Sequence, residues 1–409
     1  MKKKNMTKKS IGAVVFASAL TMSMGMPAFA AGNYDATIGG EKTTTFDKYL
    51  VMDAQAEVPN ASFTYAVTAG TAKVYNVADK KFGILAGVDA DKVTMAGVGS
   101  KTANTIAYSQ GDATSNDENA LVKGYDKTTE KYAKKTATLD FSACKFTEPG
   151  IYRYIVTESG TNQAVTNDAD ATRVVDVYVN DASDNTEYKL TIAGYVLHSN
   201  ADDAPDVSLG ENNGSAGAYV ATKSQGFTNS YDTSDLSIKK EVSGNQASRN
   251  KYFEFTVNIA NAVPGTVYKV DLSNADATTQ SNAATITANE RKTNPARLTV
   301  GKDGTVTQKF YLAHGQEIKI QGIAKDSKYK VTENAEDYKS TAAGVTNYTD
   351  ATNGTVASID LKTSYLNTRA GVIPTGVIMA VAPFAAVTLL GGAGVVTMVM
   401  KKKKSSEEE

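Results

Sequence analysis

Residues 149–159 read PGIYRYIVTES, a stretch that begins at a proline–glycine turn and then alternates in character. Tyr152, Tyr154 and Val156 fall on one side of an extended chain, because successive side chains of a strand point to opposite faces. Similar alternating stretches, separated by clusters of Asn, Asp and Gly, occur at 62–67, 174–181, 188–198, 252–259 and 329–333. Alternation bounded by turn residues predicts antiparallel strands, and no long amphipathic helix competes with them. The chain is therefore predicted to be all-β and built from β-sandwiches.

The composition argues against several classes of function. The 409 residues carry a net charge of −1 with both signs interspersed, which argues against a nucleic-acid partner. The single cysteine, Cys144, rules out an intrachain disulfide, and its place in an alternating stretch predicts a structural thiol. Only 2 histidines are present, far apart, so no zinc-type cluster is expected. Acidic clusters such as those at 199–217 could hold Ca²⁺, but they lack the EF-hand spacing and are expected to be solvated loops, so neither a metal nor a cofactor is predicted. The common hydrolase, zinc-protease and phosphate-loop motifs are missing, which leaves a surface enzyme as the weakest alternative.

The region between the two ends of the chain repeats itself loosely, which predicts two domains of one kind. Each half opens with a strand that carries a lysine and closes with a strand that carries an asparagine. These strands are expected at 44–51 and 226–231 in the first half and at 235–242 and 364–369 in the second. Between them, PGIYRYIVTES is answered by DSKYKVTENA at 326–335. We expect a first domain at 31–233 and a second at 234–370.

In both halves the alternation turns a lysine, a glutamate and an asparagine toward the apolar side. In the first strand, for example, Lys48 shares a face with Phe46 and Leu50. The six residues concerned are Lys48, Glu158 and Asn229 in the first half and Lys240, Glu333 and Asn367 in the second. A lone charge in an apolar core costs several kcal/mol unless it is paired or neutralised. Three residue types that recur in the same order therefore need a common explanation.

Two explanations of this pattern are open on the residues alone. In the first, the side chains lie near strand ends and reach water, or the lysine and glutamate form a buried salt bridge capped by the asparagine. In the second, burial lowers the pKa of the lysine and raises the pKa of the carboxyl. A neutral amine then attacks the asparagine Cγ while the carboxylic acid polarises the amide carbonyl. Ammonia leaves, and a covalent isopeptide bond ties the first strand of the domain to its last.

The two ends of the chain predict export across a membrane. A basic start, an apolar stretch and a small-x-small triplet ending at Ala30 are typical of a secretory signal peptide at 1–30. Near the other end, 377–400 contains no charged residue, and as a helix it would extend about 36 Å, enough to cross a bilayer. The lysines at 401–404 that follow would act as a cytoplasmic stop under the positive-inside rule.

The chain resembles the backbone (major) pilins of Gram-positive bacteria, in particular the streptococcal T-antigen type, over nearly its whole length. The motifs that carry the resemblance are VPNASFTY after the Lys48 strand, FTEPGIYRYIVTE, GFTNS, SIKKEVSG, KVTE, YLNT and a VPTG-like tail running into VAPF. Members of this family are pilus shaft subunits with two tandem immunoglobulin-like (CnaB-like) domains, each carrying a self-generated Lys–Asn isopeptide bond assisted by a glutamate. The resemblance implies that Lys48 joins Asn229 with Glu158 as helper. In the second domain it implies that Lys240 joins Asn367 with Glu333 as helper.

The resemblance also implies how one subunit is joined to the next. Val372-Ile373-Pro374-Thr375-Gly376 resembles a cell-wall sorting signal within a sorting region at 371–409, which a sortase cleaves between Thr375 and Gly376. The segment departs from the common Leu-Pro-x-Thr-Gly pattern, which implies a dedicated pilus sortase. Lys223 occupies the position of the acceptor amine on the next subunit, although the Tyr-Pro-Lys motif of other pilins is missing.

These implications describe a secreted subunit of a surface pilus, or fimbrium, anchored in the cell wall and structural rather than catalytic. The implied partners are a sortase, further copies of the chain in a covalent polymer, a minor or tip pilin, and peptidoglycan. The membrane span would serve only the precursor. The alternative is a monomeric, wall-anchored adhesin that binds a host ligand and does not polymerise through an acceptor lysine.

Overall fold

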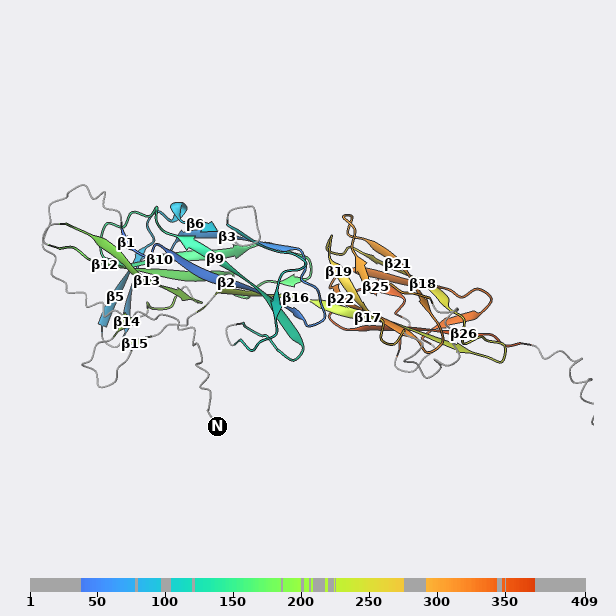
Figure 1. Cartoon of the computed structure of the whole chain (residues 1–409). Helices are drawn as coiled ribbons and strands as arrows, with labels where there is room; N and C mark the ends of the chain where they lie inside the picture. Colours follow the sequence, from blue (N-terminus) through green and yellow to red (C-terminus); the bar gives the residue numbers. More distant parts are fainter. Residues whose placement is uncertain are drawn as a thin grey trace, which may run out of the picture.

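The computed structural model is built from strands, which confirms the predicted all-β class. Figure 1 shows two β-sandwiches that follow one another along an elongated body. The structure describes residues 38–77, 80–96, 104–119, 122–184, 187–199, 202–205, 207–208, 218–219, 224, 226–275, 292–343, 348–349 and 351–371. Within this described part, a short 3-10 helix at Ala90–Lys92 interrupts the strands of the first sandwich.

The first sandwich packs an eight-stranded sheet against a six-stranded sheet. The eight-stranded sheet has the order β1-β13-β12-β10-β3-β7, with β5 paired to β10 and β4 paired to β5. Its strands are β1 (Gly39–Gly40), β3 (Ala61–Ala69), β4 (Lys73–Val77), β5 (Lys80–Ala86), β7 (Thr105–Tyr108), β10 (Gly150–Ser159), β12 (Thr172–Asp181) and β13 (Leu190–His198). The six-stranded sheet has the order β11-β16-β2-β9-β6, with β8 paired to β9. Its strands are β2 (Thr43–Asp53), β6 (Thr94–Ala96), β8 (Thr114–Ser115), β9 (Glu130–Asp140), β11 (Val165–Thr166) and β16 (Gly226–Tyr231). A separate ribbon joins β14 (Val207–Ser208) to β15 (Ala218–Tyr219).

The second sandwich packs a six-stranded sheet against a four-stranded sheet. The six-stranded sheet has the order β20-β19-β22-β17-β26-β24. Its strands are β17 (Thr233–Ser243), β19 (Val267–Asp271), β20 (Arg297–Thr299), β22 (Glu317–Ala324), β24 (Lys339–Ala342) and β26 (Leu361–Thr368). The four-stranded sheet has the order β21-β18-β23-β25. Its strands are β18 (Phe253–Ala260), β21 (Val306–Leu312), β23 (Lys328–Asn334) and β25 (Asn353–Thr355).

The longer strands form where the sequence alternates, because at least one face of each is buried in a core. In β3 the buried Phe63 and Tyr65 alternate with the exposed Ser62 and Thr64, and β18 is buried at every second residue. Full burial of a large apolar side chain stabilises the fold by about 1.5–3 kcal/mol. A slip of one residue would turn the whole apolar set to water, so the alternation also fixes the register.

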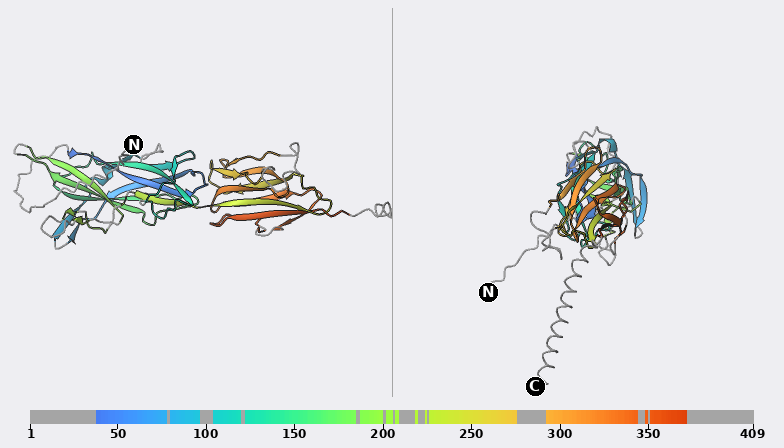
Figure 2. Two further views of the ribbon diagram at one scale, coloured as in Figure 1. Left: turned by 60° about the horizontal axis from the view of Figure 1, so that its bottom comes forward. Right: turned by 90° about the vertical axis from the view of Figure 1, so that its right-hand side faces the viewer.

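In each sandwich a long strand near the start of the domain lies beside the last strand and runs parallel to it. In the first sandwich β2 pairs with β16, and in the second β17 pairs with β26. The second pair is visible in the left view of Figure 2 as a yellow-green arrow beside a red one. Strands from the start and the end of each domain, far apart in sequence, are thus neighbours within a sheet.

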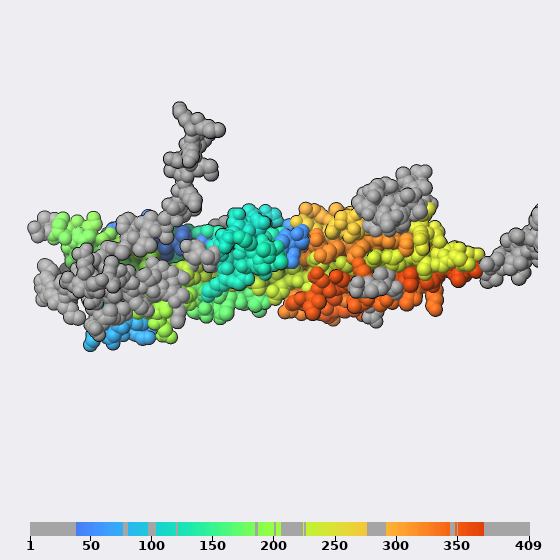
Figure 3. Space-filling view, turned by 90° about the horizontal axis from the view of Figure 1, so that it is seen from below, coloured from blue at the N-terminus to red at the C-terminus, as the bar shows by residue number. Residues whose placement is uncertain are grey.

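The two sandwiches touch end to end, as the space-filling view in Figure 3 shows. Asn60 donates a hydrogen bond from Nδ2 to the Pro264 carbonyl at 2.9 Å. Glu57 forms ion pairs with Lys269 at 3.2 Å and with Arg297 at 3.5 Å. These contacts join the loop before β3 to the loop before β19 and to the strands β19 and β20 of the second sandwich.

Several predicted segments lie outside the described residues. They are the signal peptide at 1–30, the acceptor Lys223, the sorting motif at 372–376 and the apolar stretch at 377–400. Among the residues that the structure describes, no helix is both long and apolar enough to cross a membrane.

Candidate functional site

Lys48, Glu158 and Asn229 meet in the core of the first sandwich. Lys48 on β2 and Asn229 on β16 come from one sheet, and Glu158 on β10 comes from the facing sheet. The Lys48 Nζ lies 2.7 Å from Glu158 Oε2 and 2.9 Å from Oε1. Asn229 Nδ2 donates to the same Oε1 at 2.8 Å. One carboxylate oxygen therefore holds the amine and the amide nitrogen next to each other.

Lys240, Glu333 and Asn367 form the same arrangement in the second sandwich. Lys240 on β17 and Asn367 on β26 share a sheet, and Glu333 on β23 faces them. The Lys240 Nζ lies 2.8 Å from Glu333 Oε1, and Asn367 Nδ2 donates to that oxygen at 3.0 Å. The structure therefore brings together both predicted groups of three residues.

The strand register is the same at the two sites. In the parallel pair of β2 and β16, Asn229 is the partner of Leu50, two residues beyond Lys48. In the pair of β17 and β26, Asn367 is the partner of Val242, two residues beyond Lys240. Because the side-chain period of a strand is two, each asparagine points to the same face as its lysine. The loose repeat seen in the sequence is thus a repeat of site geometry.

Both lysines are enclosed in the core rather than near water. The side chains of Lys48 and Lys240 are 0% exposed, and those of Glu158 and Glu333 are 5% and 2% exposed. This burial excludes the explanation in which the charged groups reach water at strand ends. What remains on geometry alone is a buried ion pair beside an amide, or the precursor of a covalent bond.

Burial lowers the pKa of both lysine side chains. Loss of water lowers the pKa of Lys48 to about 8, and the adjacent Glu158 carboxylate only partly offsets this shift. Burial lowers the pKa of Lys240 to about 8 as well, against the opposing effect of Glu333. Each ammonium also faces an aromatic ring, with Lys48 Nζ 4.2 Å from the centroid of Phe63 and Lys240 Nζ 4.6 Å from that of Phe253. A substantial fraction of neutral, nucleophilic amine is therefore present near pH 8.

Each glutamate has a hydroxyl partner that the sequence pattern did not single out. Tyr65 donates from its hydroxyl to Glu158 Oε2 at 2.6 Å, and Ser340 donates to Glu333 Oε2 at 2.7 Å. Burial and the Glu158 carboxylate raise the pKa of Tyr65 far above its usual value, so this hydroxyl stays a donor. Tyr65 alternates in step with Phe63 on the buried face of β3, and this alternation was the sequence feature from which its burial could have been predicted. Ser340 lies on the short strand β24, where the sequence offers no comparable pattern.

One expected contact differs from the geometry. The expected contact joins the carboxylic acid to the amide carbonyl oxygen. In both sites the glutamate instead accepts a hydrogen bond from the amide nitrogen, Asn229 Nδ2 or Asn367 Nδ2. A carboxylate between two nitrogens is placed to take a proton from the attacking amine and return it to the departing one.

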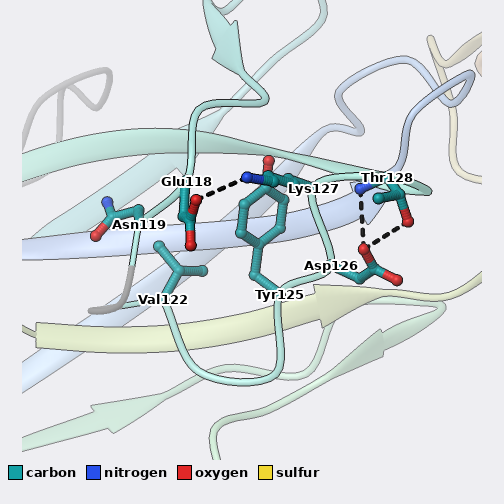
Figure 4. A pocket seen from close by; sticks show the side chains of 7 residues that line it. All are labelled: Glu118, Asn119, Val122, Tyr125, Asp126, Lys127 and Thr128. Carbon is teal, nitrogen blue, oxygen red and sulfur yellow. Dashed lines mark hydrogen bonds and ion pairs between the residues drawn. The ribbon is translucent and has the colours of Figure 1, made fainter.

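Other features of the described residues offer weaker sites. A hollow of about 330 Å³ lies beside β8 and β9, and Figure 4 shows the side chains that line it. Lys127 is ion-paired there with Glu118 at 2.6 Å, and the Thr128 hydroxyl donates to Asp126. The polar groups of this hollow contact one another rather than converge on a common point. Cys144 is buried, and burial raises the pKa of its thiol to about 11, so thiolate is scarce at neutral pH. No group of three His, Cys, Asp or Glu side chains suited to a metal occurs in the part of the chain that the structure describes.

Comparison with protein families adds independent evidence on the first sandwich. Residues 58–232 match the family described as Spy0128-like isopeptide containing domain. The match covers most of the first sandwich. The matched residues of this Spy0128-like domain include Glu158 and Asn229, and Lys48 precedes them. Residues 234–369, with Lys240, Glu333 and Asn367, match a domain of unknown function (DUF7601).

Comparison with whole proteins extends the likeness beyond the Spy0128-like domain. The chain is 25% identical over 384 residues to a protein named Pilin from Streptococcus pyogenes serotype M1, a match covering 88% of this chain and 91% of that protein. This result confirms the resemblance to streptococcal backbone pilins. Among solved structures, the major pilin protein T3.2 of Streptococcus pyogenes is 21% identical, with 82% of this chain and 100% of that chain covered and a TM-score of 0.46. Another major pilin from Streptococcus pyogenes is 20% identical, with 81% and 99% covered and a TM-score of 0.45.

Proposed function

We propose that this chain is the shaft subunit of a covalently polymerised pilus on the surface of a Gram-positive bacterium. The observation that carries the proposal is the pair of buried Lys–Glu–Asn groups with one register, in a chain homologous to a streptococcal pilin. We assign one domain to 31–233 and a second to 234–370. A fibre subunit under tension benefits from such groups if each locks its domain.

The lock is a Lys–Asn isopeptide bond in each domain. Neutral Lys48 attacks Asn229 Cγ, the new C–N bond forms, the bond from Cγ to Nδ2 breaks, and ammonia leaves. Glu158 takes the proton from the lysine and passes it to the departing nitrogen. Lys240, Asn367 and Glu333 do the same in the second domain. Each reaction happens once per chain, so the protein is structural and not an enzyme with turnover.

The position of the bonds suits a shaft. Each bond joins a strand near the start of a domain, β2 or β17, to the last strand of that domain, and these strands are parallel neighbours. In the second domain tension enters through β17 and leaves through β26, so the Lys240–Asn367 bond carries the load. The strands between them bear little of it. With one cysteine in the sequence, a disulfide cannot take this role.

Polymerisation would use the two ends of the subunit. A sortase would cleave between Thr375 and Gly376 and transfer the Thr375 carbonyl to the Lys223 amine of the next copy. The span at 377–400 and the lysines at 401–404 would hold the precursor in the membrane until then. The finished pilus would be secreted, carry a minor or tip pilin, and be attached to peptidoglycan in the cell wall.

The test of this function is the ladder of covalent oligomers in cell-wall extracts. Lys223→Ala should collapse the ladder to monomer, because the acyl-enzyme loses its acceptor amine. Lys189→Ala removes another lysine of the first domain, one that is exposed, and should leave the ladder intact. A ladder that persists in the Lys223→Ala variant refutes this acceptor, and a wild-type chain without any ladder favours the monomeric adhesin.

A further inference from the structure

A turn at Asn167–Asp168 also holds the amide of Asn229. The main-chain N–H of Asp168 donates to Asn229 Oδ1 at 2.9 Å. Asn229 Nδ2 donates to Asn167 Oδ1 at 3.1 Å and to Glu158 Oε1 at 2.8 Å. A main-chain N–H can only donate, so the atom facing it must be the carbonyl oxygen. The orientation of the reacting amide is therefore fixed by its partners.

A buried arginine clamps this turn to the strand that carries the asparagine. Asp168 Oδ2 accepts from Arg173 Nη2 at 2.5 Å and from the main-chain N–H of Thr228 at 2.9 Å. Arg173 also donates from Nε to the Gly226 carbonyl at 2.8 Å, and its side chain is 0% exposed. Charge-assisted bonds of this kind between buried groups hold geometry tightly. The turn and β16 are thus positioned as one unit.

The second domain lacks the corresponding donor among the described residues. Asn367 Nδ2 donates to Glu333, as in the first domain. Asn367 Oδ1 is buried, and no hydrogen-bond partner for it is found in the described part of the structure. The two sites thus share the lysine, the glutamate and the register, and differ at the amide oxygen.

We propose that the main-chain N–H of Asp168 is an oxyanion donor for condensation in the first domain, and that Asp168 and Arg173 are positioning residues for it. This inference rests on the isopeptide chemistry proposed above. When the Lys48 amine adds to Cγ, the carbonyl oxygen of Asn229 takes the negative charge until the bond to Nδ2 breaks. A donor already in place at that oxygen stabilises the charge without reorganisation, and loss of one such donor costs about 100- to 1000-fold in rate. The first bond therefore forms faster than the second.

The experiment follows ammonia loss over time in residues 31–371. Every described strand and both cores lie within this segment, so it contains all that the two domains need to fold. Freshly translated protein is quenched at intervals, and digestion followed by mass spectrometry assigns each bond to its domain. In the wild-type chain the Lys48–Asn229 peptide should appear before the Lys240–Asn367 peptide. Simultaneous appearance or the reverse order overturns the inference, and this readout needs no variant.

Variants at the turn give the second readout. Asp168→Pro removes the N–H and should slow the first bond by about 100-fold, with the second bond as an internal control in the same molecule. Asp168→Ala keeps the N–H but loses its clamp and should slow the first bond by a smaller factor. Asp170→Ala, a matched control whose side chain is 58% exposed, should change nothing. Unchanged kinetics in a folded Asp168→Pro protein overturn the inference, whereas a wild-type chain that never loses ammonia overturns the proposed function instead.

Discussion

Replacement of Lys48 by Met should destabilise the first domain by about 5 kcal/mol and leave the second unchanged. The proposed bond between Lys48 and Asn229 would close a loop that spans most of the first domain, from β2 to β16. In the chain-entropy model of cross-links, closure of a loop of this length removes about 5 kcal/mol of unfolded-state entropy. Methionine fills a similar volume without a buried charge, and Glu158 keeps Tyr65 and Asn229 as partners. The loss of the cross-link is therefore expected to be the main cause of the fall in the free energy of unfolding.

Differential scanning calorimetry of residues 31–371 measures the effect. For a domain of 150–250 residues, about 5 kcal/mol corresponds to a fall in Tm of roughly 10–20 °C. The transition of the second domain is the internal control, and Lys189→Met, which changes an exposed lysine of the first domain, is the matched variant. The reasoning is refuted if Lys48→Met leaves both transitions within a degree or two of the wild type.

Three further results are expected. Glu333→Gln should leave the second domain uncondensed, so that its intact mass exceeds that of the wild-type chain by about the mass of one ammonia molecule; an unchanged mass would show that Glu333 is dispensable. Condensation of both domains should slow about tenfold for each pH unit below 8, because the pKa of both lysines is lowered to about 8, and a rate that is flat from pH 6 to 8 would contradict this. In the Asn229→Ala variant Lys48 stays a free amine, and its pKa is lower in the folded than in the unfolded state. Between those two pKa values the unfolded state therefore binds more protons than the folded state. The free energy of unfolding should then rise by about 3 kcal/mol from pH 8 to pH 10.5 relative to Lys48→Met, and a parallel pH profile of the two variants would count against a buried free amine.

The six residues at the two sites could be predicted because a strand has a side-chain period of two. Lys48 and Lys240 each share a phase with buried apolar neighbours, and the phase alone places them inside. The same signal was present for Arg173, which is in step with the buried Val175 and Val177 on β12. The role of Arg173 was not predicted, since alternation shows which face of the sheet a side chain occupies but not which residue it contacts.

The remaining features depend on contacts that a local pattern does not contain. The oxyanion donor proposed for Asp168 is a main-chain N–H, which every residue except proline has. On the outer face of β10, Arg153 is buried in an ion pair with Asp176 at 2.7 Å and donates to the Tyr75 hydroxyl on the hairpin of β4 and β5. The alternation gives the outward direction of Arg153 but not the hairpin that covers it. The contacts between Glu57 and the second domain are equally remote in sequence.

The intact mass of purified residues 31–371 tests the central claim most directly. If both groups condense, the mass lies below the value calculated from the sequence by two ammonia molecules, and digestion yields branched peptides joining Lys48 to Asn229 and Lys240 to Asn367. A mass equal to the calculated value would show that the two buried groups are ion pairs beside an amide, and that the shaft is not locked in this way.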